Sequence, residues 1–239
     1  MQLLLLLDKL IEYGHAGRRL IAAVASKEKM NKKAMNDKDK PAGLTLRRCP
    51  WVDKSKPDYV DYHDHEWGVP LYDDQIIFEF LILEAAQAGL SWYTVLKKRD
   101  NYRAAFDHFD PQAVARYDEK KVAGLLANPG IIRNRSKIAA AVTNAQRFIE
   151  VQDEFGTFAE YIWSFVNHVP KINSPRNLAD YPATSPESDA LSRDLKGRGF
   201  KFMGSTICYA HMQATGLVND HALNCFRRAE IISTYGKNI

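Results

Sequence analysis

A glutamate stands on the apolar face of the strongest predicted helix in this sequence. The helix takes Asp73 or Asp74 as its N-cap and extends to about Ala88, because apolar residues recur at helical spacing until a glycine supplies the stop. Glu84 follows Phe80 by four positions, so its carboxylate falls on the stripe that should face the core. Burying an unpaired carboxylate is costly. Either a neighbouring backbone group or arginine satisfies this glutamate, or it serves a ligand.

Aromatic residues flank the same helix at unusual density. Tyr62 and Trp67 precede it, and Trp92 and Tyr93 follow it. Such a group of rings suits a flat ligand that can stack between them. The nearby aromatic residues favour the functional interpretation of Glu84, which is the first candidate for a catalytic or binding carboxylate.

Two cysteines and two histidines form a candidate metal site that is split across the chain. Cys49 and His63 lie near the start of the aromatic-rich region, and His221 and Cys225 lie near its end. The last two are four residues apart, so we expect both on one helical turn with their side chains pointing the same way. Two thiolates and two imidazoles make a closed, structural zinc set. The spacing is not that of a standard zinc finger, so four unrelated residues remain an alternative on spacing alone.

The composition is that of a globular protein with an appendage at its beginning. Of 239 residues, 46% are hydrophobic and 26% charged, and the net charge of +4 only weakly favours a polyanionic partner. Residues 1–46 combine a short apolar run, too interrupted to span a membrane, with a Lys- and Asn-rich linker. We expect this extension to be dispensable, with Met35 as the natural start. Residues 47–228 then form the main domain and residues 229–239 a C-terminal tail.

The main domain is predicted to be all-α. Ser91 should cap a second helix that contains KKRDNYRAAF, with Lys97, Lys98 and Arg99 on its exposed side. Further helices are expected after Asp110, after Asp118, across RNRSKIAAAVTNAQRFIEVQDEFG, over TFAEYIWSFVN, after Ser185 and in the C-terminal block. No run alternates with period two between hairpin turns, as strands would.

The segment GFKFMGSTICYAHMQ has the pattern of a helix–hairpin–helix. One helix ends at the preceding glycines, a short hairpin follows, and the next helix begins near Ser205. Such a hairpin directs backbone N–H groups and a helix N-terminus at a DNA phosphate without reading the bases. Any corner between two helices can hold two glycines, so the pattern alone is weak.

Several motifs together resemble a known family. They are RCPWV, YHDHEWGVP, LEAAQAGLSWYTVLKKRDNYRAAF, GIIRNRSKI, WSFVNH and SDALSRDLKGRGFKFMGSTICYAHMQATGLVNDH. These segments look like the DNA-3-methyladenine glycosylase I family, bacterial base-excision repair enzymes of the helix–hairpin–helix superfamily. The resemblance extends from Arg48 to Cys225 and leaves both ends of the chain uncovered.

The resemblance implies a helix–hairpin–helix glycosylase fold whose chain ends are joined by one structural Zn²⁺. It places the family's zinc ligands on Cys49, His63, His221 and Cys225, and its base-recognising glutamate on Glu84. Its pocket aromatics fall on Trp51, Tyr59, Tyr62, Trp67 and Trp92. The expected reaction is hydrolysis of the N-glycosidic bond that releases 3-methyladenine from alkylated double-stranded DNA.

The resemblance also implies a monofunctional hydrolase. The catalytic aspartate of the wider superfamily falls on Asn219, and the lysine of its strand-cleaving members falls on Ser205, which cannot form a Schiff base. We expect a cytoplasmic monomer with no membrane attachment and no protein partner. The alternatives are a glycosylase for other alkylated bases and a zinc-containing DNA-binding module without activity.

Overall fold

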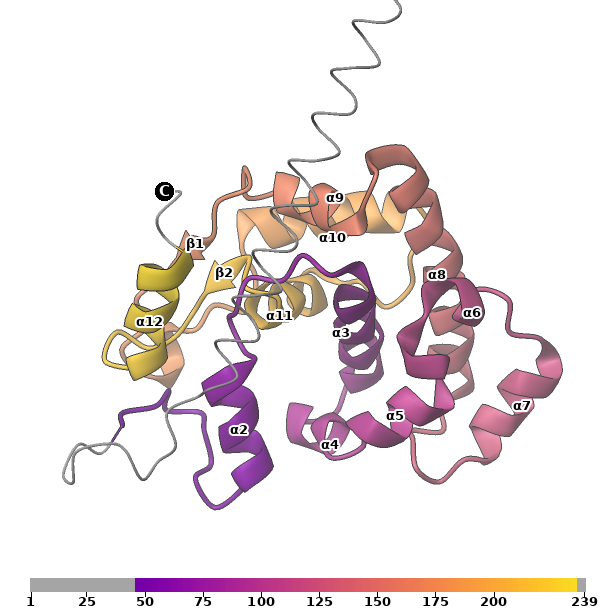
Figure 1. The fold of residues 1–239 in the computed structure, drawn as a ribbon, viewed down its shortest axis with the longest axis horizontal. Helices are drawn as coiled ribbons and strands as arrows, with labels where there is room; N and C mark the ends of the chain where they lie inside the picture. Colours follow the sequence, from indigo (N-terminus) through magenta and orange to yellow (C-terminus); the bar gives the residue numbers. More distant parts are fainter. Residues whose placement is uncertain (1–45, 236–239) are drawn as a thin grey trace, which may run out of the picture. The chain divides into compact units, whose positions relative to one another are not determined.

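The computed structural model describes residues 46–235, and these residues fold into a mostly helical unit (Figure 1). Its α-helices are α2 (Pro57–His65), α3 (Asp74–Gln87), α4 (Trp92–Leu96), α5 (Arg99–Ala105), α6 (Pro111–Val114), α7 (Glu119–Ala127), α8 (Arg135–Phe155), α9 (Phe158–Ser164), α10 (Pro186–Gly197), α11 (Ser205–Ala214) and α12 (Phe226–Tyr235). Two short 3₁₀ turns, η2 (Asp107–Phe109) and η3 (Leu178–Asp180), join them. The prediction of a helical domain is confirmed. The expectations for residues 1–45 and for the last four residues lie outside the described part.

Helix α3 is the centre of the fold. The Asp73 side chain caps it by accepting a hydrogen bond from the Ile76 N–H, as the sequence predicts. The helix packs against α4, α8, α9 and α11, and nearly its whole surface is buried. A helix that is apolar on every side belongs in a core. Two carboxylates, Glu79 and Glu84, are nevertheless buried on it.

The region after α3 departs from the sequence-based prediction. Ser91 caps α4 as expected, accepting a hydrogen bond from the Thr94 N–H, but the chain bends and a separate helix, α5, begins at Arg99. The exposed position predicted for Arg99 is wrong, since only 6% of this residue is accessible. Its guanidinium binds Glu79 and Glu66. Both acidic partners are distant in sequence, and the bend that turns the arginine toward them cannot be read from helical periodicity.

The predicted hairpin lies between α10 and α11. Ser185 caps α10 through a capping box, and α11 begins at Ser205, as expected. The intervening turn takes Gly199 to a φ of +93°, a conformation that favours glycine. The Ser205 hydroxyl lies 2.9 Å from the Ser188 hydroxyl and also donates to Asp189. These contacts tie the start of α11 to α10, so Ser205 has a structural role here.

A two-residue parallel pair, β1 (Lys171–Ile172) with β2 (Val218–Asn219), is the one feature of the described domain outside the all-α prediction. The chain reaches β2 through Gly216, whose φ is +77° and whose Cβ position lies 2.3 Å from the Pro70 nitrogen. Only glycine fits there. This close approach returns the end of the domain to its beginning, where α2 and α12 lie on the same side in Figure 1. A backbone hydrogen bond from Phe226 to Arg47 joins the two ends directly.

Candidate active site and metal centre

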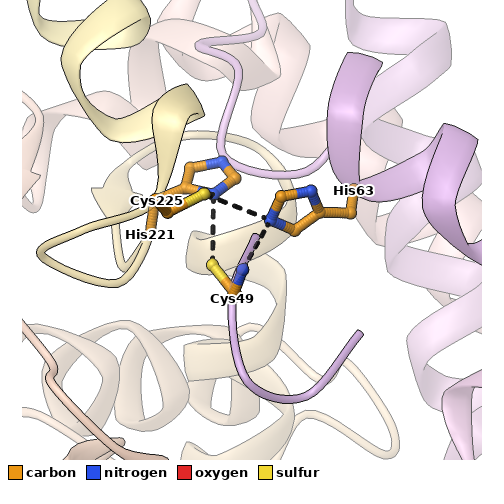
Figure 2. Close-up of side chains that lie close together, drawn as sticks. All are labelled: Cys49, His63, His221 and Cys225. Carbon is orange, nitrogen blue, oxygen red and sulfur yellow. Dashed lines mark hydrogen bonds between the residues drawn. The ribbon is translucent and has the colours of Figure 1, made fainter. Parts of the chain in front are cut away.

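The four predicted metal ligands converge in one buried cluster. Their ligand atoms all lie within 4.8 Å of one another. Figure 2 shows the side chains arriving from three segments: the loop before α2, α2 itself, and the loop between β2 and α12. The Cys49 Sγ lies 3.4 Å from the His221 Nδ1, and the Cys225 Sγ lies 3.5 Å from both the His221 Nδ1 and the His63 Nε2.

The local structure around the last two ligands differs from the prediction. His221 and Cys225 do not share a helical turn, because α12 begins only at Phe226. A tight turn, closed by a hydrogen bond from the Cys225 N–H to the Ala222 carbonyl, brings them together instead. Gly68 packs against the His221 ring, and a Cβ at this position would lie 3.1 Å from it.

The surroundings of the cluster fit two histidines that could hold a metal ion. The far nitrogen of His63 lies 2.7 Å from Asp64, which Arg48 holds through hydrogen bonds to both carboxylate oxygens. The far nitrogen of His221 lies 2.9 Å from the Trp67 carbonyl. Such partners fix the tautomer and orientation of a histidine ligand. The other ring nitrogen, Nε2 of His63 and Nδ1 of His221, therefore faces the sulfur atoms.

The electrostatics of the cluster favour a thiolate at Cys225, while the hydrogen bond to Cys225 and burial raise the pKa of the Cys49 thiol. Hydrogen bonds from Cys49, and then from His221 and His63, lower the pKa of the Cys225 thiol against the opposing effect of burial. Thiolate is the form in which cysteine binds metals. The donor set therefore can hold a metal ion with two sulfur and two nitrogen ligands.

A cavity of about 310 Å³ opens beside this cluster. The five predicted pocket aromatics and Glu84 all line it, so the structure places all six residues around one space. The remaining lining residues are Gln87, Leu178, Tyr181, Pro182, Ala210, Gln213 and Ala214. The volume is that of a small-molecule site of modest size.

The aromatic rings of the cavity pack against one another. The Trp51 ring meets Trp67 edge-on at 4.8 Å between centroids and also lies 5.2 Å from Tyr59. On the α3 side, Tyr62 packs against Trp92 at 5.4 Å. Burial, the largest influence, raises the pKa of Tyr62 well above 10, so its phenol stays neutral. Preorganised rings of this kind can hold a planar ligand at little entropic cost.

Glu84 lies at the inner end of the cavity with one partner. Its Oε2 is 2.9 Å from the His211 Nδ1, and the two side chains are 2% and 1% exposed. Burial raises the pKa of the Glu84 carboxyl, while His211 acts in the opposite direction. The sequence indicated a buried carboxylate but not its partner. Because His211 lies on a distant helix and the hairpin motif that contains it says nothing of Glu84, only the packing of α11 on α3 reveals the pair.

A second group that sequence reasoning missed is the loop before α10, which contributes Leu178, Tyr181 and Pro182 to the cavity. The capping box of η3, formed by Asn177 and Asp180, holds this loop in shape. Its Pro- and Asn-rich composition indicates only a loop. Nothing in it indicates that the loop lines a pocket formed by other segments.

The two residues before His221, Asn219 at the end of β2 and Asp220, have structural partners. Asn219 accepts a hydrogen bond from the His221 N–H. The buried Asp220 carboxylate accepts from Asn173, from the Tyr209 hydroxyl and from Gln213, at 2.6 to 2.7 Å. Neither residue lines the cavity.

Comparisons with known proteins agree on one family. A sequence model described as methyladenine glycosylase matches residues 51–228. DNA-3-methyladenine glycosylase 1 of Escherichia coli (strain K12) is 51% identical over 180 residues, which are 75% of this chain and 96% of that protein. DNA-3-methyladenine glycosylase of Haemophilus influenzae is 48% identical over 178 residues, covering 74% and 96% of the two chains.

Solved structures give the same answer. A crystal structure of 3-methyladenine DNA glycosylase I is similar with a TM-score of 0.72 at 52% identity, covering 75% of this chain and 98% of the other. A structure of the Staphylococcus aureus enzyme, determined to explain 3-methyladenine recognition, has a TM-score of 0.74 at 36% identity and covers 77% and 98%.

Proposed function

This chain belongs to the methyladenine glycosylase family, and from that premise we propose how its own residues carry out the reaction. The chain is a DNA-3-methyladenine glycosylase that removes 3-methyladenine from DNA in base-excision repair. The observation that supports our mechanism is the buried Glu84 carboxylate at the inner end of a cavity walled by aromatic rings.

The cavity suits a flat, cationic base. Methylation at N3, while N9 remains bonded to the sugar, gives the damaged adenine a fixed positive charge. Once the nucleotide is flipped out of the duplex, its base stacks among Trp51, Trp67 and Trp92, where cation–π attraction of about 1 kcal/mol favours it over uncharged adenine. Glu84 accepts a hydrogen bond from the exocyclic amine and complements the charge.

The chemistry follows from that charge. When the bond between C1′ and N9 breaks, its electron pair passes to the cationic base, which leaves as neutral 3-methyladenine. Water adds to the oxocarbenium-like C1′ and releases a proton. Because the leaving group needs no protonation, the enzyme needs less acid catalysis than one removing a neutral base.

The reaction ends at the abasic sugar, without strand cleavage. Ser205 occupies the position of the lysine found in strand-cleaving relatives, and its hydroxyl is engaged by Ser188 and Asp189. Asn219 occupies the position of the superfamily's aspartate and does not line the cavity. Stabilisation of the developing positive charge on the sugar therefore falls mainly to the phosphates of the bound DNA.

The metal at the Cys49, His63, His221 and Cys225 cluster is one structural Zn²⁺. With Zn–S near 2.3 Å and Zn–N near 2.0–2.1 Å, the sulfur–nitrogen edge of a tetrahedron is about 3.5–3.6 Å. The sulfur–nitrogen separations of 3.4 and 3.5 Å fit that edge. Four protein ligands leave no position for a catalytic water, so the ion joins the ends of residues 47–228 without taking part in the reaction.

Double-stranded alkylated DNA binds across the hairpin between α10 and α11. Backbone N–H groups at the start of α11 contact a phosphate, as in other helix–hairpin–helix proteins, and position the flipped nucleotide over the cavity. None of the helices within residues 46–235 is long and apolar enough to cross a membrane. We propose that the protein acts on this DNA as a monomer in the cytoplasm.

The test is release of bases from methylated DNA, separated and identified by chromatography. We expect 3-methyladenine as the main product, with an intact DNA strand until the abasic site is cleaved by alkali. Substantial release of 3-methylguanine at a similar rate would favour a broader alkyl-base glycosylase. Binding of the DNA without release of any base would favour a DNA-binding module.

A further inference from the structure

The only hydrogen-bond partner of the Glu84 side chain within residues 46–235 is His211. This histidine sits on α11, faces α3, and is 1% exposed. Its Nδ1 reaches the Oε2 of Glu84 at 2.9 Å. The second carboxylate oxygen, Oε1, takes no hydrogen bond in the described structure, and Glu84 lines the cavity. The histidine therefore holds the carboxylate by one oxygen and leaves the other for a ligand.

The other ring nitrogen identifies the protonation state. The His211 Nε2 is buried and has no hydrogen-bond partner in the described structure. If the ring were a cation, Nε2 would be an unsatisfied buried N–H donor, which is costly. In the neutral form with the proton on Nδ1, Nε2 has only a lone pair, and Nδ1 still donates to Glu84. The geometry therefore favours the neutral Nδ1–H tautomer.

The charge of the pair depends on that proton. A neutral histidine beside an ionised Glu84 leaves a net charge of −1 facing the cavity, which attracts a cationic base. One more proton on either residue makes the pair neutral and removes the attraction. Because 3-methyladenine in DNA has a fixed positive charge, the substrate itself does not titrate with the pair.

We propose that His211 is the positioning residue of the base site: its Nδ1–H holds the Glu84 carboxylate toward the base, and uptake of a proton by the pair switches off recognition of the cationic base. This inference rests on the proposed function. It adds to that function a group that does not touch the substrate but sets the charge that the substrate meets.

Two other titratable groups in the described structure interact electrostatically with Glu84, and neither changes charge near neutrality. On α2, burial raises the pKa of Tyr62 well above 10. On α11, burial raises the pKa of the Cys208 thiol to about 12. The charge of Lys196 on α10 acts on Cys208, while His211 is the one side chain with a resolved influence on the pKa of Glu84. An acid limb in the excision rate would therefore report proton uptake by this pair.

The decisive variant is His211→Gln. A glutamine amide can still donate to Glu84 but cannot accept a proton, so the proton that inactivates the pair must bind the carboxyl itself. We expect the acid limb of single-turnover 3-methyladenine release to move relative to that of the wild type, because the imidazole that can share the proton with Glu84 is gone. In the Glu84→Gln background, His211→Gln should change nothing further. Superimposed pH profiles of wild type and His211→Gln, measured on folded protein with equal metal content, would overturn the proposal.

A second measurement does not depend on activity. Long-range ¹H–¹⁵N spectra of histidine-labelled protein report the tautomer of each ring, and His211→Gln assigns the signal. We expect the Nδ1–H tautomer at pH 7.5 and protonation of the pair on acidification. An Nε2–H tautomer, or a cationic ring at pH 7.5, would refute the proposal even if the wild type releases 3-methyladenine. Conversely, failure of the wild type to release any base would contradict the proposed function. The tautomer of His211 would still test its proposed role in holding Glu84.

Discussion

Replacing Glu84 with Gln separates charge from shape in the base site. The amide is nearly isosteric, and its oxygen can still accept from the His211 Nδ1–H at the present 2.9 Å. What disappears is one negative charge opposite a cationic base. At about 4 Å and an effective dielectric constant near 20, two unit charges attract by about 4 kcal/mol. With its oxygen engaged by His211, the amide presents its NH2 group to the base and cannot accept from the exocyclic amine, so we expect a loss of about 4 kcal/mol, or roughly 1000-fold in 3-methyladenine release.

The same substitution should not weaken the fold. Burial raises the pKa of Glu84, so the unfolded chain ionises this carboxyl more readily than the folded one. Above the pKa that Glu84 has in the unfolded chain, its negative charge lowers the stability of the fold, and this penalty is relieved as the pH falls. Glu84→Gln lacks the penalty at pH 7.5. We therefore expect its melting temperature to equal or exceed that of the wild type.

Glu79→Gln is the matched control. Glu79 is buried on the same helix, 6% exposed, but it binds Arg99 and Arg103 instead of facing the cavity. Its replacement should lower the melting temperature and leave the single-turnover rate of the folded protein unchanged. The assay is release of 3-methyladenine from methylated DNA with enzyme in excess. An unchanged rate for Glu84→Gln, or an equal loss for both variants, would refute the reasoning.

Three further predictions concern the scaffold. Cys225→Ser, or removal of zinc by a chelator, should destabilise the domain, and metal analysis of the wild type should find about one zinc per chain; a metal-free protein of full stability would contradict this. Gly216→Ala should lower the unfolding free energy by more than about 2 kcal/mol, because its Cβ would lie 2.3 Å from the Pro70 nitrogen. The control is Gly156→Ala, at a similar φ of +86° but with nothing within 4 Å of the added Cβ, which should lower it by only about 1 kcal/mol. Both unfolding free energies are measured in denaturant melts. Deleting residues 1–46 should preserve the excision rate at moderate salt, and a large loss there would show that the extension takes part in DNA binding.

Features that depend on neighbours in the chain were determined by the sequence itself. The caps at Asp73, Ser91 and Ser185 follow from side chains that bond to backbone groups within three residues. The burial of Glu84 follows from helical periodicity in the same way. These interactions are local, so residue type and spacing are sufficient to predict them.

Features that depend on which elements meet were decided only by the tertiary structure. Arg99 is buried because the bend before α5 turns it toward Glu79, and no periodicity records that bend. His221 and Cys225 come together through a turn and not a helix. The pairing of His211 with Glu84 joins residues 127 positions apart. Such contacts arise from the packing of whole helices against one another, and a single sequence contains no local signal for which residues that packing will bring face to face.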